Sequence, residues 1–166
     1  MYIKRAILIW CVLAAGASWT HAADRSFLDL LSGNWQGDGE LLGQEAAATL
    51  RFERILGGNF LRQEYRNDRH QAEGKISFSA VAIYKVNKDG SLIGHWYDSR
   101  GVVLPLSGKT SANRLEVEWG TLEIEQGRTV YEISEDGELR VTDYVLREGA
   151  YQQFGLHYYS NYRKNY

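Results

Sequence analysis

Residues 75–99 read KISFSAVAIYKVNKDGSLIGHWYDS, and this stretch decides the fold class. Apolar and polar side chains alternate along 75–86, which is typical of a β-strand with one buried face. Residues 87–90 (Asn-Lys-Asp-Gly) have the composition of a tight turn, whose glycine can adopt the positive φ that hairpins require. Residues 91–99 form the expected return strand. The stretch therefore predicts an antiparallel β-hairpin.

The same alternation recurs through the rest of the chain. A second hairpin turn is expected at 135–137 (Glu-Asp-Gly), and no segment between strands is long enough for the crossover helix that parallel pairing needs. We therefore expect an all-β fold: an antiparallel up-and-down barrel of about ten strands, which leaves no sheet edge open. A β-sandwich is the alternative. The further expected strands cover 34–42, 46–55, 59–67, 102–107, 114–119, a short piece around 122–125, 129–133, 138–146 and 151–163.

One short helix is expected ahead of the first strand. Ser26 and Asp29 have the spacing of a capping box, and an apolar face follows at 27–31. Gly33 can end the helix in the left-handed conformation. Helical periodicity is absent after this point, so the helix accompanies the sheet rather than crossing between its strands.

The first 22 residues have the pattern of a secretory signal peptide. Lys4 and Arg5 precede an apolar run at 6–16, and small residues follow up to Ala22. The run is shorter than the roughly 20 residues that span a bilayer, although a retained membrane anchor is the alternative. We expect cleavage after Ala22, no integral membrane segment after processing, and a single periplasmic or secreted domain over 23–166.

Composition and motifs argue against several functions. The formal net charge is −2, and the basic residues are scattered, so a nucleic-acid footprint is not expected. Catalytic motifs of the G-x-S-x-G and H-E-x-x-H types are absent, as are paired cysteines. Asp98 could act as an acid or base, but its position favours capping the turn at 99–101. The sequence thus favours a non-catalytic protein, with an enzyme that uses cavity carboxylates as an alternative.

Three segments carry a resemblance to a known family. The Gly-Asn-Trp at 33–35, within LLSGNWQGDGE at 30–40, resembles the opening of the calycins, which include lipocalins and fatty-acid-binding proteins. Together with ILGGNFLRQEY at 55–65 and WYDSRG at 96–101, it is similar to an uncharacterised bacterial lipocalin-like family. The resemblance implies that Trp35 packs across the closed end of the barrel, near Arg163.

The opening is also similar to that of nitrobindin-type haem barrels. The motif of that family continues into Tyr-Pro, where this chain has Glu40-Leu41-Leu42. That family keeps a haem-ligating histidine in its last strand, where this chain has His157. The resemblance therefore makes haem the alternative cofactor; otherwise no cofactor is expected.

The expected function is binding or carriage of a small, largely apolar molecule in the mouth of the barrel. The chain has eleven tyrosines, whose rings are apolar while their hydroxyls are polar. We expect Tyr65, Trp96, Tyr144 and Tyr158 to contact the ligand.

The last strand presents two faces that lead to different expectations. Its even-numbered residues, from Phe154 to Tyr162, are the more apolar, which favours that set inside and leaves His157 on the outer wall. The calycin resemblance favours the odd set, because Arg163 should reach Trp35. A bulge at Gly155 or near residue 160 would reconcile the two. With the even set inside, we expect no haem binding through His157 and no effect of its replacement by alanine.

Overall fold

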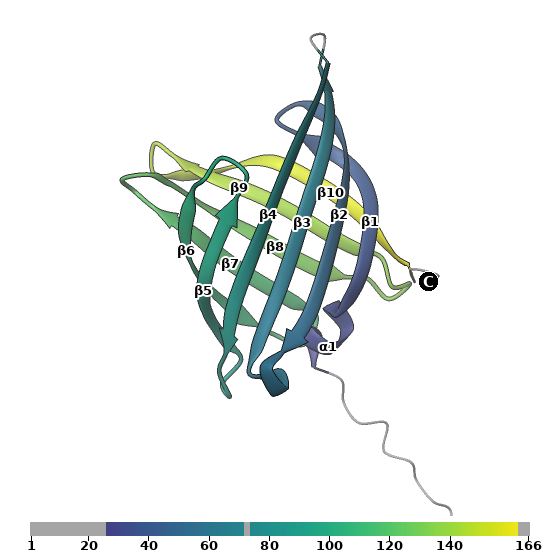
Figure 1. The fold of residues 1–166 in the computed structure, drawn as a ribbon, viewed down its shortest axis with the longest axis vertical. Coiled ribbons are helices and arrows are strands. Elements are labelled where there is room, and N and C mark those ends of the chain that lie inside the picture. The colour runs from purple at the N-terminus through teal and green to yellow at the C-terminus, as the bar shows by residue number, and fades with distance from the viewer. Residues whose placement is uncertain (1–25, 72–73, 163–166) are drawn as a thin grey trace, which may run out of the picture.

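Ten antiparallel strands form a closed barrel, and one short helix lies at one end of it (Figure 1). The structure is a computed structural model, and it describes residues 26–71 and 74–162. Each strand pairs with its neighbours in the chain, and β1 pairs with β10 to close the sheet. The up-and-down barrel is confirmed, and the sandwich is excluded. The elements are α1 (Phe27–Leu31), β1 (Gly33–Leu41), β2 (Gln44–Ile55), η1 (Leu56–Gly58), β3 (Phe60–Gln71), β4 (Gly74–Val86), β5 (Ser91–Asp98), β6 (Val103–Thr110), β7 (Arg114–Thr121), β8 (Glu125–Ile133), β9 (Leu139–Arg147) and β10 (Ala150–Tyr162).

The hairpin read from 75–99 is present as β4 and β5. Its turn is closed by a hydrogen bond of 3.2 Å from the Gly90 amide to the Asn87 carbonyl, and Gly90 has a φ of 79°. The short strand expected around 122–125 is absent from the described residues. Those residues instead make the turn from β7 to β8, in which Thr121 pairs with Glu125.

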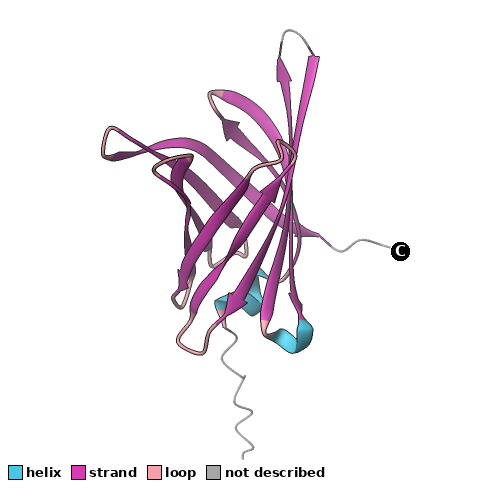
Figure 2. Ribbon diagram, turned by 60° about the vertical axis from the view of Figure 1, so that its left-hand side comes forward, coloured by secondary structure: helices cyan, strands magenta, loops and turns pink. Residues whose placement is uncertain are grey.

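Helix α1 and the start of β1 close one end of the barrel (Figure 2). Trp35 is buried there, and its indole nitrogen donates a hydrogen bond of 2.8 Å to the Leu31 carbonyl. Arg54 on β2 holds the helix in place by an ion pair of 2.9 Å with Asp29. Large apolar side chains fill the barrel next to this helix: Phe27, Leu31, Phe52, Leu61, Tyr84, Leu92, Leu115 and Leu139. Arg163, the expected partner of Trp35, lies outside the described residues.

A β-bulge in β10 changes which face of the last strand points inward. The register with β9 shifts between Gln153 and Gly155. After the bulge the odd residues are inside: His157 is 0% exposed and Tyr159 is buried, whereas Tyr158 is 44% exposed. The expectation of an inward even face is therefore wrong for this part of the strand.

Two glycines of β1 explain why the rings of His157 and Tyr159 can point into the barrel. Gly37 pairs with Tyr159, and Gly39 pairs with His157. A Cβ atom at residue 39 would lie 2.1 Å from the Leu156 carbonyl oxygen and 2.9 Å from the His157 ring. The glycines of the opening motif thus allow β10 to approach β1 closely, with its rings on the inner side.

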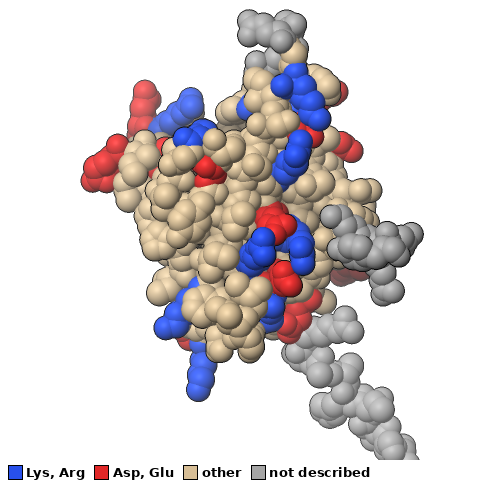
Figure 3. Space-filling model, viewed as in Figure 1, with Lys and Arg blue, Asp and Glu red and all other residues tan. Residues whose placement is uncertain are grey.

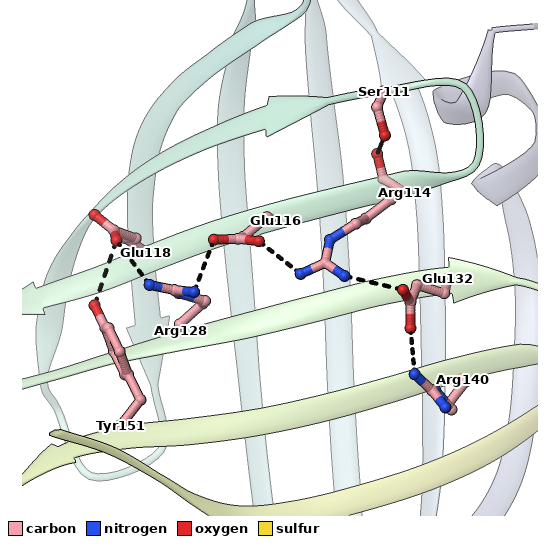
Figure 4. A network of polar contacts seen from close by, with 8 residues as sticks. All are labelled: Ser111, Arg114, Glu116, Glu118, Arg128, Glu132, Arg140 and Tyr151. Carbon is pink, nitrogen blue, oxygen red and sulfur yellow. Dashed lines mark hydrogen bonds and ion pairs between the residues drawn. The ribbon is translucent and has the colours of Figure 1, made fainter.

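The outer wall over β7, β8 and β9 carries a chain of ion pairs (Figure 4). Arg114 contacts Glu116 at 2.7 Å and Glu132 at 3.0 Å, Arg128 contacts Glu116 at 3.1 Å, and Arg140 contacts Glu132 at 2.6 Å. Such accessible pairs contribute about 0–1 kcal/mol each. On the face shown in Figure 3, basic and acidic side chains are intermixed rather than gathered by sign.

Candidate functional site

The barrel encloses a cavity of about 340 Å³ at the end opposite α1. This volume is within the range typical of small-molecule sites. Most of the lining is apolar or aromatic, and the polar groups fall into a buried set and a rim set. The apolar and aromatic lining comprises Leu41, Leu42, Leu50, Tyr65, Phe78, Trp96, Leu104, Trp119, Tyr131, Val141, Val145, Phe154 and Tyr159.

Aromatic rings stand on two sides of the cavity. On one side, the Tyr65 ring lies 6.1 Å from both Phe78 and Trp96, and those two rings are stacked at 6.4 Å. On the other, Trp119 meets Phe154 edge to face, with ring centroids 6.4 Å apart. Phe154 comes from the bulged part of β10, so the bulge contributes a ring to the wall.

Gln63 and Tyr131 line the cavity and belong to a hydrogen-bonded group of three buried polar side chains. The buried Gln63 amide accepts a hydrogen bond of 2.9 Å from the Tyr84 hydroxyl and donates one of 2.9 Å to the Tyr131 hydroxyl oxygen. Burial raises the pKa of both phenols, which stay neutral. These two hydrogen bonds link β3 and β4 to β8 across the inside of the barrel.

Asp143 on β9 is a carboxyl group in the cavity wall. The Thr129 hydroxyl donates to Asp143 Oδ1 at 2.7 Å, and the Trp119 indole donates to Thr129 at 3.2 Å. Burial raises the pKa of Asp143 to about 6, against the smaller effect of the Thr129 bond. Gly155 makes room for it, since a Cβ atom there would lie 2.9 Å from Asp143 Oδ2.

Asn67 on β3 is the second buried polar group in the wall. Its amide nitrogen donates a hydrogen bond of 3.0 Å to the Tyr65 hydroxyl oxygen. Its Oδ1 atom is buried and has no hydrogen-bond partner among the described residues. Most buried polar atoms have a hydrogen-bond partner, so this oxygen is an unusual feature of the cavity wall.

Charged residues stand at the rim. Arg100 forms ion pairs with Asp98 at 2.7 Å and with Glu125 at 2.6 Å. Asp98 also accepts a hydrogen bond of 2.8 Å from the Arg100 backbone amide, so it caps the turn as the sequence favours. Arg69 and Arg147 complete the charged lining.

Of the four residues expected to contact a ligand, the structure brings two into the cavity. Tyr65 and Trp96 line it. Tyr144 does not, because it lies between Asp143 and Val145, which face inward, and alternation along a strand turns it outward. Tyr158 lies on the outer wall after the β10 bulge, where it borders a depression between β1 and β10.

The sequence analysis missed Asn67, Trp119 and Asp143. One signal could have found Asp143: Val141, Asp143 and Val145 share a face of β9, so an apolar inner face includes one acid. No comparable pattern singles out Asn67, which follows Tyr65 by two residues in a largely polar strand.

His157 is inside the barrel wall but does not line the cavity. Both ring nitrogens are buried without a partner among the described residues, and burial lowers the pKa of the imidazole. Its expected place on the outer wall is therefore wrong. The described cavity lining includes no histidine, so it does not fit the haem alternative, which needs an imidazole facing the cavity. No cluster of metal-ligating side chains is found within residues 26–71 and 74–162.

No protein-family model matches the chain, and no curated protein has a matching sequence. Within the part of the chain that the structure describes, no helix is long and apolar enough to cross a membrane.

Proposed function

We propose that the protein is an exported, non-catalytic barrel of the lipocalin-like type that binds a small, largely apolar molecule in the cavity opposite α1. The observation that carries this proposal is the cavity lining, in which aromatic rings on two sides enclose a few buried polar groups. Small-molecule sites typically combine apolar walls with a small number of placed polar atoms.

The division of the barrel interior supports this proposal. Buried apolar side chains fill the end next to α1, and the cavity lies toward the other end. A barrel built only for stability has no need of such a space, because interiors pack to high density.

The carboxylates of the cavity support binding over catalysis. Glu125 is held in an ion pair with Arg100 at the rim. Asp143 is then the one cavity acid among the described residues without a charged partner, so the lining has no pair of free carboxylates for an enzyme that uses cavity carboxylates. A single buried carboxyl suits recognition.

Binding is tested with N-phenyl-1-naphthylamine, an apolar probe whose fluorescence rises in apolar sites. The mature domain, residues 23–166, should bind it at one site. Val145→Trp, which fills the cavity, should weaken binding at least about 10-fold, whereas Val103→Trp on the exposed outer face should leave it unchanged. Equal binding by both variants, or none by the unsubstituted domain, contradicts the proposal.

Export is tested separately, because this part of the proposal rests only on the signal-peptide pattern of the first 22 residues. The intact mass of protein recovered from the periplasm or the medium should match a chain that begins at Ala23. A full-length, membrane-extracted product would contradict the periplasmic or secreted location.

A further inference from the structure

We infer that the ligand carries a hydrogen-bond-donating head group, an amine above all, which enters the cavity between Asp143 and Asn67 while its apolar body lies against the aromatic rings. This inference rests on the proposed function, because it names the chemical class of the molecule that the cavity would take.

Asn67 supplies the first argument. The side chain is 1% exposed, yet its Oδ1 atom has no partner among the described residues. Its amide nitrogen is already occupied by the Tyr65 hydroxyl oxygen. A buried acceptor without a donor is costly to the fold, and a donor on a ligand would satisfy it.

Asp143 supplies the second argument. One of its oxygens accepts from Thr129, which is itself fixed by the Trp119 indole, so the carboxyl group has a set orientation. Its side chain is half-buried, although desolvation is strong enough to raise its pKa, and no basic residue forms an ion pair with it among the described residues. A cationic or neutral donor on the ligand would take the place of that missing partner.

The two acceptors belong to one region of the cavity. Both groups line the same cavity, Asn67 from β3 and Asp143 from β9. Asn67 donates to the Tyr65 hydroxyl oxygen, and the Tyr65 ring joins Phe78 and Trp96 in the cavity wall. Aromatic faces attract cations, which again favours an amine over an acid.

The arginines at the rim of the cavity would suit a different class of ligand, one with an acidic head group. Arg100 is neutralised by Asp98 and Glu125. Arg69 and Arg147 follow Asn67 and Asp143 along their strands toward the open end, and Arg69 Nε is also buried without a partner among the described residues. An acidic ligand would be held at these two residues, which makes its binding the outcome that overturns the inference.

The test compares four molecules with the same naphthalene body. Displacement of N-phenyl-1-naphthylamine at pH 7.5 is measured with 2-naphthylmethylamine, 2-naphthylmethanol, 2-(methoxymethyl)naphthalene and 2-naphthoic acid. The amine should bind at least about 10-fold more tightly than the ether and the acid, with the alcohol between, as expected for a bond to a charged acceptor. Equal binding of amine and ether, or tightest binding of the acid, overturns the inference.

Variants locate the preference. Asp143→Asn should remove most of the advantage of the amine over the ether, and Asn67→Ala should reduce it. Glu118→Gln, which removes a carboxylate from the exposed outer wall, should leave that advantage unchanged. Circular dichroism checks that each variant folds. If a variant does not fold, the comparison of the four molecules on the unsubstituted domain alone tests the inferred preference for an amine.

The outcomes separate this inference from the proposed function. If the probe binds and Val145→Trp blocks it, while amine, ether and acid bind alike, the cavity binds ligands but the donor class is wrong. If the probe does not bind the unsubstituted domain, the proposed function itself fails.

Discussion

Asp143 is a residue whose ionisation works against the fold. Its pKa is about 6 in the folded protein, raised by burial, against about 3.9 in an unfolded chain. Between these values the folded state holds more protons, so its stability falls as the pH rises from about 4 to 6, and the loss is complete above that range. A carboxyl group that lowers the stability of the folded protein is expected to persist at a position where a ligand requires it.

Replacing Asp143 by asparagine should therefore stabilise the free protein. Asparagine keeps an oxygen for the Thr129 hydroxyl and removes the buried charge. At pH 7.5 the free energy of unfolding should rise by about 1–3 kcal/mol, and near pH 4 the gain should vanish. Urea unfolding at the two pH values measures this. A variant less stable than the parent at pH 7.5 would show that the carboxylate has a partner.

His157 produces the opposite dependence on pH. Burial lowers the pKa of its imidazole, against a smaller effect of the Asp38 charge, so the folded state holds the ring neutral. An unfolded chain takes up a proton below about pH 6.5. The contribution of His157 to stability is thus full above that pH. It declines as the pH falls toward the pKa of the imidazole in the folded protein.

The variant His157→Gln should lose this acid-induced decline. Its unfolding free energy should change less between pH 7 and pH 5 than that of the parent, measured by urea unfolding. Because the ring is buried, His157→Ala should also lower stability at pH 7, by about 2 kcal/mol or more. An unchanged pH profile in His157→Gln would place the ring in contact with water.

At the scale of elements, α1 and β1 act together to close the barrel. Trp35 joins them through its buried ring and its hydrogen bond to Leu31. Trp35→Ala should lower the free energy of unfolding by about 3–5 kcal/mol, the usual cost of emptying a large aromatic site. Chemical denaturation measures the loss, with Trp96→Ala in the open cavity as a control that should lose less. A loss below about 1 kcal/mol for Trp35→Ala would contradict the assigned packing.

The strands β9 and β10 show where sequence-based prediction reached its limit. Alternation fixes which residues share a face, but one extra residue reverses the face, and the bulge before Gly155 does so. As a result, His157 lies inside and Tyr158 outside, the reverse of what alternation alone predicts. Tyr144 alternates with Val141, Asp143 and Val145 along β9, so the pattern of this strand already indicates that Tyr144 faces outward.

At the scale of the whole molecule, the sequence predicted the fold class and approximate strand number well. Regular alternation, turn residues and the lack of crossover helices leave few arrangements other than a meander that closes on itself. The cavity was beyond such reasoning, because it depends on which inner side chains meet across the barrel. Asn67 and Asp143, for example, come from strands that are far apart in the chain and are not hydrogen-bonded to each other.

The molecule therefore consists of a packed end and a hollow end, and its tryptophans report on each. Trp35 lies in the packed end, whereas Trp96 and Trp119 line the cavity. The other two tryptophans of the chain precede residue 23, so the mature domain contains only these three indole N–H groups. Tryptophan-to-phenylalanine variants assign their nuclear magnetic resonance signals.

The most direct test of the account is a titration of ¹⁵N-labelled mature domain with N-phenyl-1-naphthylamine, followed through these three indole signals. Binding in the cavity predicts that the signals of Trp96 and Trp119 shift together and saturate, while that of Trp35 stays in place. A shift of Trp35 as large as the other two, or saturable binding that moves neither Trp96 nor Trp119, would contradict the claim that the open end of the barrel is the binding site.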